Sequence, residues 1–160
     1  MRRQEREIRN PSDIHDILRR NNVAVVSMLD GSRPYGVMTN YAFSLEDGRV
    51  VLYFHGAPEG RKAECLRRNP AVSVFVNDAP AMELAGHGSE ACRWTMRYAS
   101  VVLEGSMRIL EDPEEKRDAM RRFMRHYTDR DVVLPDAALR ATMVMKLVPD
   151  AISGKRNPPA

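Results

Sequence analysis

The sequence predicts a mainly β domain of the α+β class, in which antiparallel strands dominate and helices lie at the margins. One observation behind this is a series of apolar segments separated by tight turns. Asp30-Gly31 follows the apolar residues 23–29, and Glu46-Asp47-Gly48 precedes residues 49–55. Because Asp-Gly between β-like segments is a strong hairpin signal, we expect an antiparallel meander here.

A second observation concerns residues 49–55, RVVLYFH, which are apolar on both faces rather than alternating. A strand of this kind must be covered on both sides. A closed barrel with a helix or a second subunit against its outside would provide that cover.

The remaining elements follow from local signals. Helices are expected after Asn10-Pro11, from Gly60 to Asn69 and after Asp112-Pro113, where the side chain of aspartate can cap the helix and proline suits the first position. A residue before proline avoids the α region, so Asn69 is a natural end. Strands are expected at 23–29, 34–44, 49–55, 71–77, 97–110 and 142–148. The predicted order is αβββαββαβ, with six strands and three helices.

Length and hydropathy predict a single domain over residues 1–155, with residues 156–160 as a mobile tail. The chain has 160 residues and is 43% hydrophobic, which is enough for a core of its own. No run approaches the roughly eighteen apolar residues that cross a membrane, so no membrane partner is expected. The charged start, MRRQEREIRN, lacks the apolar segment of a signal peptide. A cytoplasmic location is therefore expected.

The charge pattern argues against a nucleic-acid partner. The net charge is +3, but the basic residues alternate with acidic ones, as in RRQEREIR and DPEEKRDAMRR. There is no block of one sign and no interleaving of basic and aromatic residues. Cys65 and Cys92 have no metal-ligand spacing with each other or with the four histidines. We therefore expect no metal site. Two cysteines could form a disulfide, but free thiols are expected in a cytoplasmic chain.

The start of the second helix is unusual because Gly60 is followed by two cations, Arg61 and Lys62. Helices favour acidic residues in the first turn, where the unpaired amides carry the positive end of the dipole. Two interpretations follow. The charges are solvated on a short surface helix, or they bind an anion such as phosphate, which glycine allows to approach the backbone.

A set of short motifs occurs in order along the chain. They are Met1-Arg2-Arg3, Glu5-Arg6-Glu7-Ile8, Pro34-Tyr35, Phe54-His55, Ala57, Glu59-Gly60, Lys62, Asn69-Pro70, Trp94, Tyr98-Ala99-Ser100-Val101, Gly105 and Ile152-Ser153-Gly154-Lys155. In these residues the chain resembles the pyridoxamine 5′-phosphate oxidase-like flavoproteins, and more narrowly their nitroimidazole-resistance (Nim) branch. The similarity spans nearly the whole chain, and it is the order and spacing of the many short matches that make it specific.

The resemblance implies a six-stranded antiparallel split β-barrel with flanking helices, the FMN-binding split barrel. It also implies a homodimer that holds flavin mononucleotide (FMN) at the subunit interface. The implied cofactor-binding residues fall into three groups. Gly60, Arg61 and Lys62 would hold the phosphate, Val37, Met38, Thr39 and Asn40 would lie along the isoalloxazine ring, and Trp94 and Ser100 would come from the partner chain.

Three interpretations of His55 remain open. As a histidine at a strand end, it can be a structural residue whose nitrogens are hydrogen-bonded. In the Nim-like branch the matching histidine lies in the active pocket near the cofactor, which would make His55 a cofactor-binding and catalytic residue. Some split-barrel proteins bind haem, so His55 could also be an axial ligand of haem iron.

Two departures from the family pattern bear on the substrate pocket. Ala99 stands between Tyr98 and Ser100 where a polar residue, often arginine, is expected, and Gly56 follows the histidine where serine is common. The further arginines that bind pyridoxal phosphate in the oxidases proper are not located in this sequence. A true vitamin B6 oxidase is therefore not expected.

The function expected from the resemblance is an FMN-dependent reductase of small electron-poor organic compounds such as nitroaromatics. The flavin ring would carry the electrons, which agrees with the absence of a convincing catalytic triad. The alternatives are a non-catalytic haem- or flavin-binding protein and a reductase that uses deazaflavin as an exchanging cosubstrate.

Overall fold

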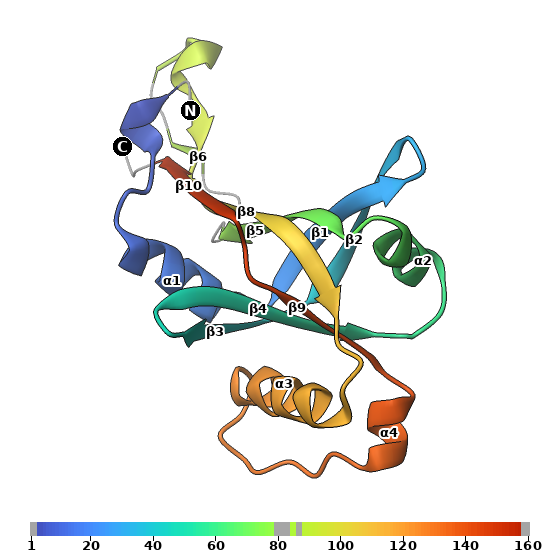
Figure 1. The fold of residues 1–160 in the computed structure, drawn as a ribbon. Helices are drawn as coiled ribbons and strands as arrows, with labels where there is room; N and C mark the ends of the chain where they lie inside the picture. The colour runs from blue at the N-terminus through green and yellow to red at the C-terminus, as the bar shows by residue number, and fades with distance from the viewer. Residues whose placement is uncertain (1–2, 79–83, 86–87, 158–160) are drawn as a thin grey trace.

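A computed structural model describes residues 3–78, 84–85 and 88–157 of the chain (Figure 1). Its elements, in order, are η1 (Gln4–Arg6), α1 (Pro11–Arg20), β1 (Val23–Asp30), β2 (Arg33–Asn40), β3 (Ala42–Glu46), β4 (Arg49–Gly56), α2 (Arg61–Arg68), β5 (Ala71–Asp78), β6 (Leu84–Ala85), η2 (Ala91–Arg93), β7 (Thr95–Met96), β8 (Tyr98–Ile109), α3 (Pro113–Arg125), α4 (Asp136–Arg140), β9 (Met143–Leu147) and β10 (Ala151–Asn157).

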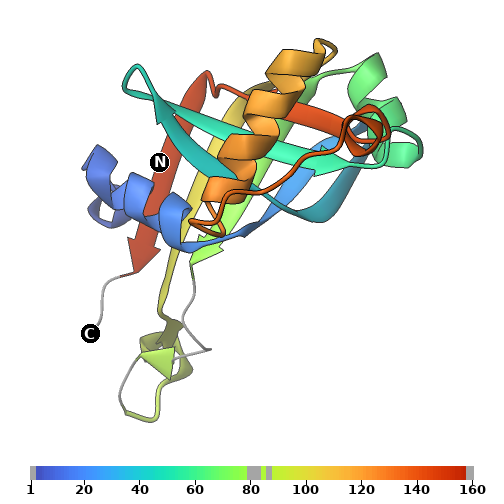
Figure 2. The same ribbon diagram turned by 90° about the horizontal axis from the view of Figure 1, so that it is seen from below.

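The main sheet is antiparallel and curls into a barrel. Its strand order is β2-β1-β5-β8-β9-β4-β3, and β10 pairs with β8 beside this path. The first and last strands of the path, β2 and β3, follow each other in the chain and are separated only by Tyr41. The sheet therefore bends until its two edges meet, while β6 and β7 form a separate two-stranded ribbon (Figures 1 and 2).

The barrel interior is filled by the alternate side chains of its strands, which belong to one buried cluster. Helices contribute to the same cluster from separate places. α1 supplies Ile17 and Leu18, and α2 supplies Ala63, Cys65 and Leu66. In Figures 1 and 2 these two helices lie at opposite ends of the barrel, so each closes one end of the core.

The outer side of β3, β4 and β9 is covered by α3. A second buried cluster lies between them and contains Ala42, Val51, Tyr53, Leu110, Ala119, Phe123 and Val144. The apolar pattern of β4 on both faces is thereby explained, since one face points into the barrel and the other contacts α3. Cover by a helix was one of the two solutions that the sequence predicted for this strand.

The two ends of the described chain meet at Gly154. The amide of Ile8 donates to the carbonyl oxygen of Gly154 at 2.9 Å, and the backbones of Glu7 and Lys155 form an isolated antiparallel β-bridge. A Cβ atom at position 154 would lie only 2.9 Å from Cβ of Ile8 and 3.2 Å from Cγ1 of Ile14. Glycine at this position therefore allows the N-terminal segment to pack directly on β10.

The split-barrel fold and most predicted elements are confirmed. All three predicted helices begin within a few residues of the predicted positions, and the side chain of Asp112 caps α3 as expected. In α1 the capping side chain is that of Asn10, which accepts a hydrogen bond from the amide of Ser12. The predicted strand over 34–44 is instead two strands, because Tyr41 is fully buried between β2 and β3 and the chain changes direction there.

The short elements η1, η2, β6, β7 and α4 were not predicted, and neither was β10. β10 and the division of the strand over 34–44 give the main sheet eight strands rather than six. β10 extends to Asn157, two residues into the segment expected to be a tail. Residues 158–160 of the expected tail, and His87, lie outside the described residues. None of the described helices is long and apolar enough to span a membrane.

Candidate functional site

The start of α2 is uncapped and follows a constrained loop. Gly60 is the N-cap residue, with φ of 98°, a conformation that glycine adopts readily, and because glycine has no side chain it makes no capping hydrogen bond to the first turn. Arg67 donates to the carbonyl oxygen of Pro58 at 2.7 Å, which ties the preceding loop to the helix. The helix therefore begins with free backbone donors in a fixed position.

Arg61 is engaged by its own chain. Its Nε donates to Oδ2 of Asp30 at 2.9 Å, and its guanidinium group lies over the ring of Tyr35, 4.1 Å from the centroid. Arg68 donates to the other oxygen of Asp30 at 2.7 Å. The hydrogen bonds from Arg68 and Arg61 lower the pKa of Asp30. Arg61 thus connects α2 to the β1–β2 hairpin, a role that the sequence did not predict.

Lys62 differs from Arg61 because it has no carboxylate partner within the described part of the chain. Its side chain is half-buried and lies against Gly56, where a Cβ atom would be only 2.6 Å from Nζ. Burial lowers the pKa of Lys62. The departure at position 56 therefore has a physical meaning: glycine leaves the space that the tip of Lys62 occupies.

His55 lies at the end of β4, opposite Val144 of β9. Its ring meets the ring of Phe123 edge to face, with centroids 4.6 Å apart and planes at 79°. One side of the imidazole is exposed in the single chain, while the other is removed from water by α3. This burial lowers the pKa of His55, and the charge of Lys62 lowers it further. His55 and Lys62 therefore belong to one site.

The predicted flavin-contacting residues of β2 divide between its two faces. Val37 packs against the barrel core and Thr39 is half-buried, whereas Met38 is 71% exposed and Asn40 is also exposed. β2 ends the path of the sheet, so among the described residues no strand pairs with its outer edge. Its backbone there remains available to a ligand.

Ser100 and Trp94 lie away from Lys62 in the same chain. Ser100 is on β8, opposite Asn77 and Lys155, and Trp94 precedes β7 and donates to the carbonyl oxygen of Gly88 at 3.0 Å. In Figures 1 and 2 the β6–β7 ribbon and α2 lie at opposite ends of the molecule. A single chain does not bring these two residues to Lys62, and their contribution from a partner stays a prediction.

A row of apolar side chains crosses the outside of β2, β1, β5 and β8. Directly opposed residues of antiparallel strands share a face, and the pairing places Met38, Val25, Phe75 and Val102 in one row. Phe75 is 40% exposed. We call this surface, defined by these four residues, the open face. Asn40 of β2 and Ser100 of β8 lie on the same side of the sheet as the open face.

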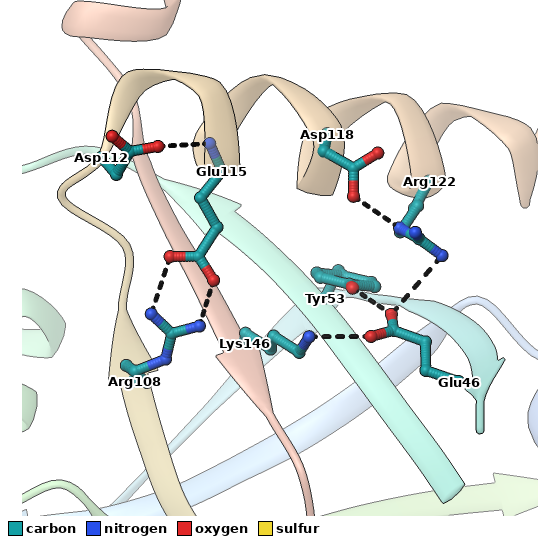
Figure 3. Close-up of polar contacts among 8 residues, drawn as sticks. All are labelled: Glu46, Tyr53, Arg108, Asp112, Glu115, Asp118, Arg122 and Lys146. Carbon is teal, nitrogen blue, oxygen red and sulfur yellow. Dashed lines mark hydrogen bonds and ion pairs between the residues drawn. The ribbon is translucent and has the colours of Figure 1, made fainter. Parts of the chain in front are cut away.

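The polar groups beneath α3 contrast with Lys62, because each has a partner. Glu46 accepts hydrogen bonds from Tyr53 and from Nζ of Lys146, the latter at 2.8 Å, and lies 3.7 Å from Arg122 (Figure 3). Arg108 and Glu115 form a two-pronged ion pair nearby. Burial alone would raise the pKa of Glu46, but the bonds from Lys146 and Tyr53 outweigh it and lower the pKa. This is a structural network.

Sequence reasoning missed Phe123 as a neighbour of His55 and Asp30 as the partner of Arg61. The position of Phe123 in the sequence gives no sign of which strand its ring will meet. Within the described residues, no group of three His, Cys, Asp or Glu side chains is placed to hold a metal ion.

Comparison with known proteins supports this description. A family model for pyridoxamine 5′-phosphate oxidase matches residues 10–156. A candidate 5-nitroimidazole antibiotic resistance protein from Bacteroides thetaiotaomicron is 32% identical, with a TM-score of 0.80 and with 94% of this chain and 86% of that one covered. No curated protein matches the sequence significantly.

More distant structures share the fold. The flavocytochrome Anf3 from Azotobacter vinelandii is 19% identical, with a TM-score of 0.81 and with 99% of this chain and 72% of that one covered. The FAD and haem binding protein from Mycobacterium smegmatis is 18% identical, with a TM-score of 0.80 and coverage of 95% and 73%. Fold, sequence and family model agree, and the chain belongs to the pyridoxamine 5′-phosphate oxidase-like split-barrel family, with its similarity to the nitroimidazole-resistance branch.

Proposed function

We propose that this protein is a flavoprotein that binds FMN and reduces small electron-poor organic compounds, of which nitroaromatics are the model class. The observation that carries the proposal is the ammonium group of Lys62, which is half-buried near His55 at the start of α2 and has no carboxylate partner among the described residues. A half-buried cation without a counterion is costly, and a phosphate group offsets that cost.

The residues present fit a flavin phosphate. Lys62 supplies a charge, and the uncapped start of α2 supplies backbone donors that face an anion. Arg61 has its Nε committed to Asp30, so any phosphate contact must come from its terminal amino groups. Family membership and the 32% identical relative, described for nitroimidazole resistance, favour a flavin as the owner of the phosphate.

The proposed assembly is a homodimer with the cofactor at the subunit interface. Exposed apolar side chains on the open face suit a second copy of the chain better than water. Ser100 and Trp94 are too far from Lys62 to serve the same site within one chain, and a partner would supply them. The small-molecule substrate would then enter between the subunits.

Bound FMN supplies the electron-transfer chemistry, and the protein binds and orients the ring. Lys62 holds the phosphate end, the exposed edge of β2 offers backbone groups to the ring, and His55 forms part of the pocket wall. Because its pKa is lowered, His55 is neutral near pH 7 in the unliganded chain and can accept or donate a hydrogen bond.

The experiments described below also test two alternative functions. A non-catalytic haem- or flavin-binding protein would use the exposed ring of His55 as an iron ligand or a contact, and fold relatives described as binding haem and FAD motivate this version. A deazaflavin-dependent reductase would use the same phosphate site for an exchanging cosubstrate. We also propose a cytoplasmic location.

The first experiment is a visible absorption titration of the purified protein with FMN, with FAD and haem in parallel. We expect the flavin bands to shift at one FMN per chain, and Lys62→Ala to weaken the response. Lys116→Ala on α3 is the matched control and should bind as the wild type does. A Soret band after addition of haem, with no response to FMN, would replace the reductase by the haem-binding alternative.

Substrate class is tested with the flavin-loaded protein. After anaerobic reduction of the flavin, a nitroaromatic compound should reoxidise it faster than it reoxidises the same concentration of free reduced FMN. Equal rates with and without protein would remove the reductase function but leave flavin binding intact.

A further inference from the structure

The contact between Lys62 and Gly56 depends on a missing side chain. Nζ of Lys62 would be 2.6 Å, and Cε 3.3 Å, from a Cβ atom at position 56. Real Cβ atoms do not approach other atoms as closely as the shorter distance, so any side chain at this position displaces the lysine tip. The ammonium group is therefore held over the backbone of the residue that follows His55.

The other described side chains that pack near His55, from α3 and β9, are uncharged. α3 presents the ring of Phe123, with Tyr127 stacked behind it, and β9 presents Val144. Burial raises the pKa of Tyr127, which keeps its hydroxyl neutral where histidine titrates. Among the described residues, the one charge that shifts the titration of His55 comes from Lys62.

Two positive charges in a partly dehydrated site repel each other, and Lys62 is charged first because its ordinary pKa is higher. We propose that anion binding by Lys62 is linked to proton uptake by His55. An oxyanion that neutralises Lys62 removes the repulsion, and the imidazole then takes a proton from solvent. No covalent step is involved. The inference rests on the proposed function, in which the oxyanion is the flavin phosphate.

Linkage is reciprocal, which fixes the sign of the pH dependence. If anion binding raises the pKa of His55, protonated protein binds the anion more tightly. Anion affinity should therefore rise as pH falls through the titration of His55 and level off below it. For the proposed reductase, loading the flavin would also place a protonated imidazole in the pocket wall.

The test uses sulfate as the probe, because its charge is constant where histidine titrates. The pKa of His55 is measured in the full chain by NMR of the imidazole C–H group, with sodium sulfate and with sodium chloride at equal ionic strength. His55→Asn assigns the signal.

We expect sulfate to raise the pKa of His55. Lys62→Gln should raise the pKa of His55 without sulfate and abolish the sulfate response, while Lys116→Gln should preserve it. Gly56→Ala keeps the lysine but displaces its tip, so it should weaken the response. The proposal is overturned if sulfate leaves His55 unchanged in the wild type, or if the response survives in Lys62→Gln.

These outcomes are separate from those of the proposed function. FMN that binds with a shifted spectrum while the pKa of His55 responds to neither sulfate nor FMN would overturn the linkage and leave the flavoprotein intact. A sulfate response in a chain that binds no flavin would keep the linkage and remove the flavoprotein.

Discussion

The outside of the barrel differs between its two halves. Over β3, β4 and β9, α3 buries an apolar cluster, and the charged groups at its margin are paired around Glu46. On the open face, across β2, β1, β5 and β8, apolar side chains such as Met38 and Phe75 remain exposed. Lys62, which lies against Gly56 at the end of β4, has no counterion in the described chain.

This difference separates residues that stabilise a single chain from residues whose partner would be a ligand or a second chain. A paired charge or a covered ring has its partner within the chain, and its removal should be seen in unfolding. An exposed apolar row or an unpaired half-buried cation is incomplete in the single chain, and its removal should be seen in binding or association. The predictions below follow this division.

The largest effect is expected on the covered side. Phe123 is 5% exposed and contacts both His55 and Tyr127, so Phe123→Ala should lower the free energy of unfolding by about 3–5 kcal/mol. Phe75→Ala, on the open face, should cost about 1 kcal/mol when unfolding is measured at a protein concentration low enough for monomers. Equal losses in the two variants would mean that both faces are equally covered.

The next effect contrasts two lysines. Lys62→Ala should weaken FMN binding by about 1.5–3 kcal/mol, or roughly 10- to 100-fold, with little loss of unfolding free energy. Lys146→Ala removes a hydrogen bond to Glu46 and should show the reverse pattern, with normal FMN affinity and about 1 kcal/mol less stability. Fluorescence titration and urea unfolding measure the two quantities. Full flavin affinity in Lys62→Ala would show that the phosphate lies elsewhere.

Association is tested on the open face. Met38 is 71% exposed in the single chain, and Met38→Glu would place a charge in the proposed interface. We expect the dissociation constant of the dimer to rise at least about tenfold, because a charge removed from water without a partner is costly. Sedimentation velocity reports the oligomeric state, and circular dichroism should report an unchanged fold. A dimer unaffected by the substitution would place the interface on another surface.

The smallest effect is a pH dependence of the covered side. The pKa of Glu46 is below its ordinary value of 4.5, so its stabilising contribution is complete above that pH and is lost as pH falls through the lowered pKa. Glu46→Gln should therefore be less stable than the wild type near pH 7, by about 1 kcal/mol, and the difference should shrink below about pH 4. Unfolding measured from pH 7 to 3 checks this, and a constant difference would contradict it.

Much of the fold follows from local sequence signals. Asn10-Pro11 and Asp112-Pro113 mark helix starts through capping chemistry that requires no distant contact. β10 was missed because its residues, AISGKRN, have no strand pattern of their own, and its strand conformation depends on pairing with β8 and on Ile8. The break at Tyr41 was also missed, because it depends on the burial of this side chain in the folded barrel and not on a local sequence signal.

The candidate site was predictable in part. The unusual order of Gly60, Arg61 and Lys62 indicated a binding site. The different surroundings of the two cations could not be predicted, because Asp30, the partner of Arg61, is distant in the sequence and Gly56, beside Lys62, has no side chain. Only the fold shows that Arg61 is paired and that Lys62 has no carboxylate partner among the described residues.

The contact of Ile8 with Gly154 has a consequence for the order of folding. Ile8 is synthesised long before β10, yet its backbone partner and the surface that buries it are both on that strand. The hydrogen bond from Ile8 to Gly154 therefore forms only after β10 has been synthesised, and closing this contact spans nearly the whole described chain. We expect the amide of Ile8 to gain protection from hydrogen exchange only once β10 is in place on β8, so it can serve as a probe of that step.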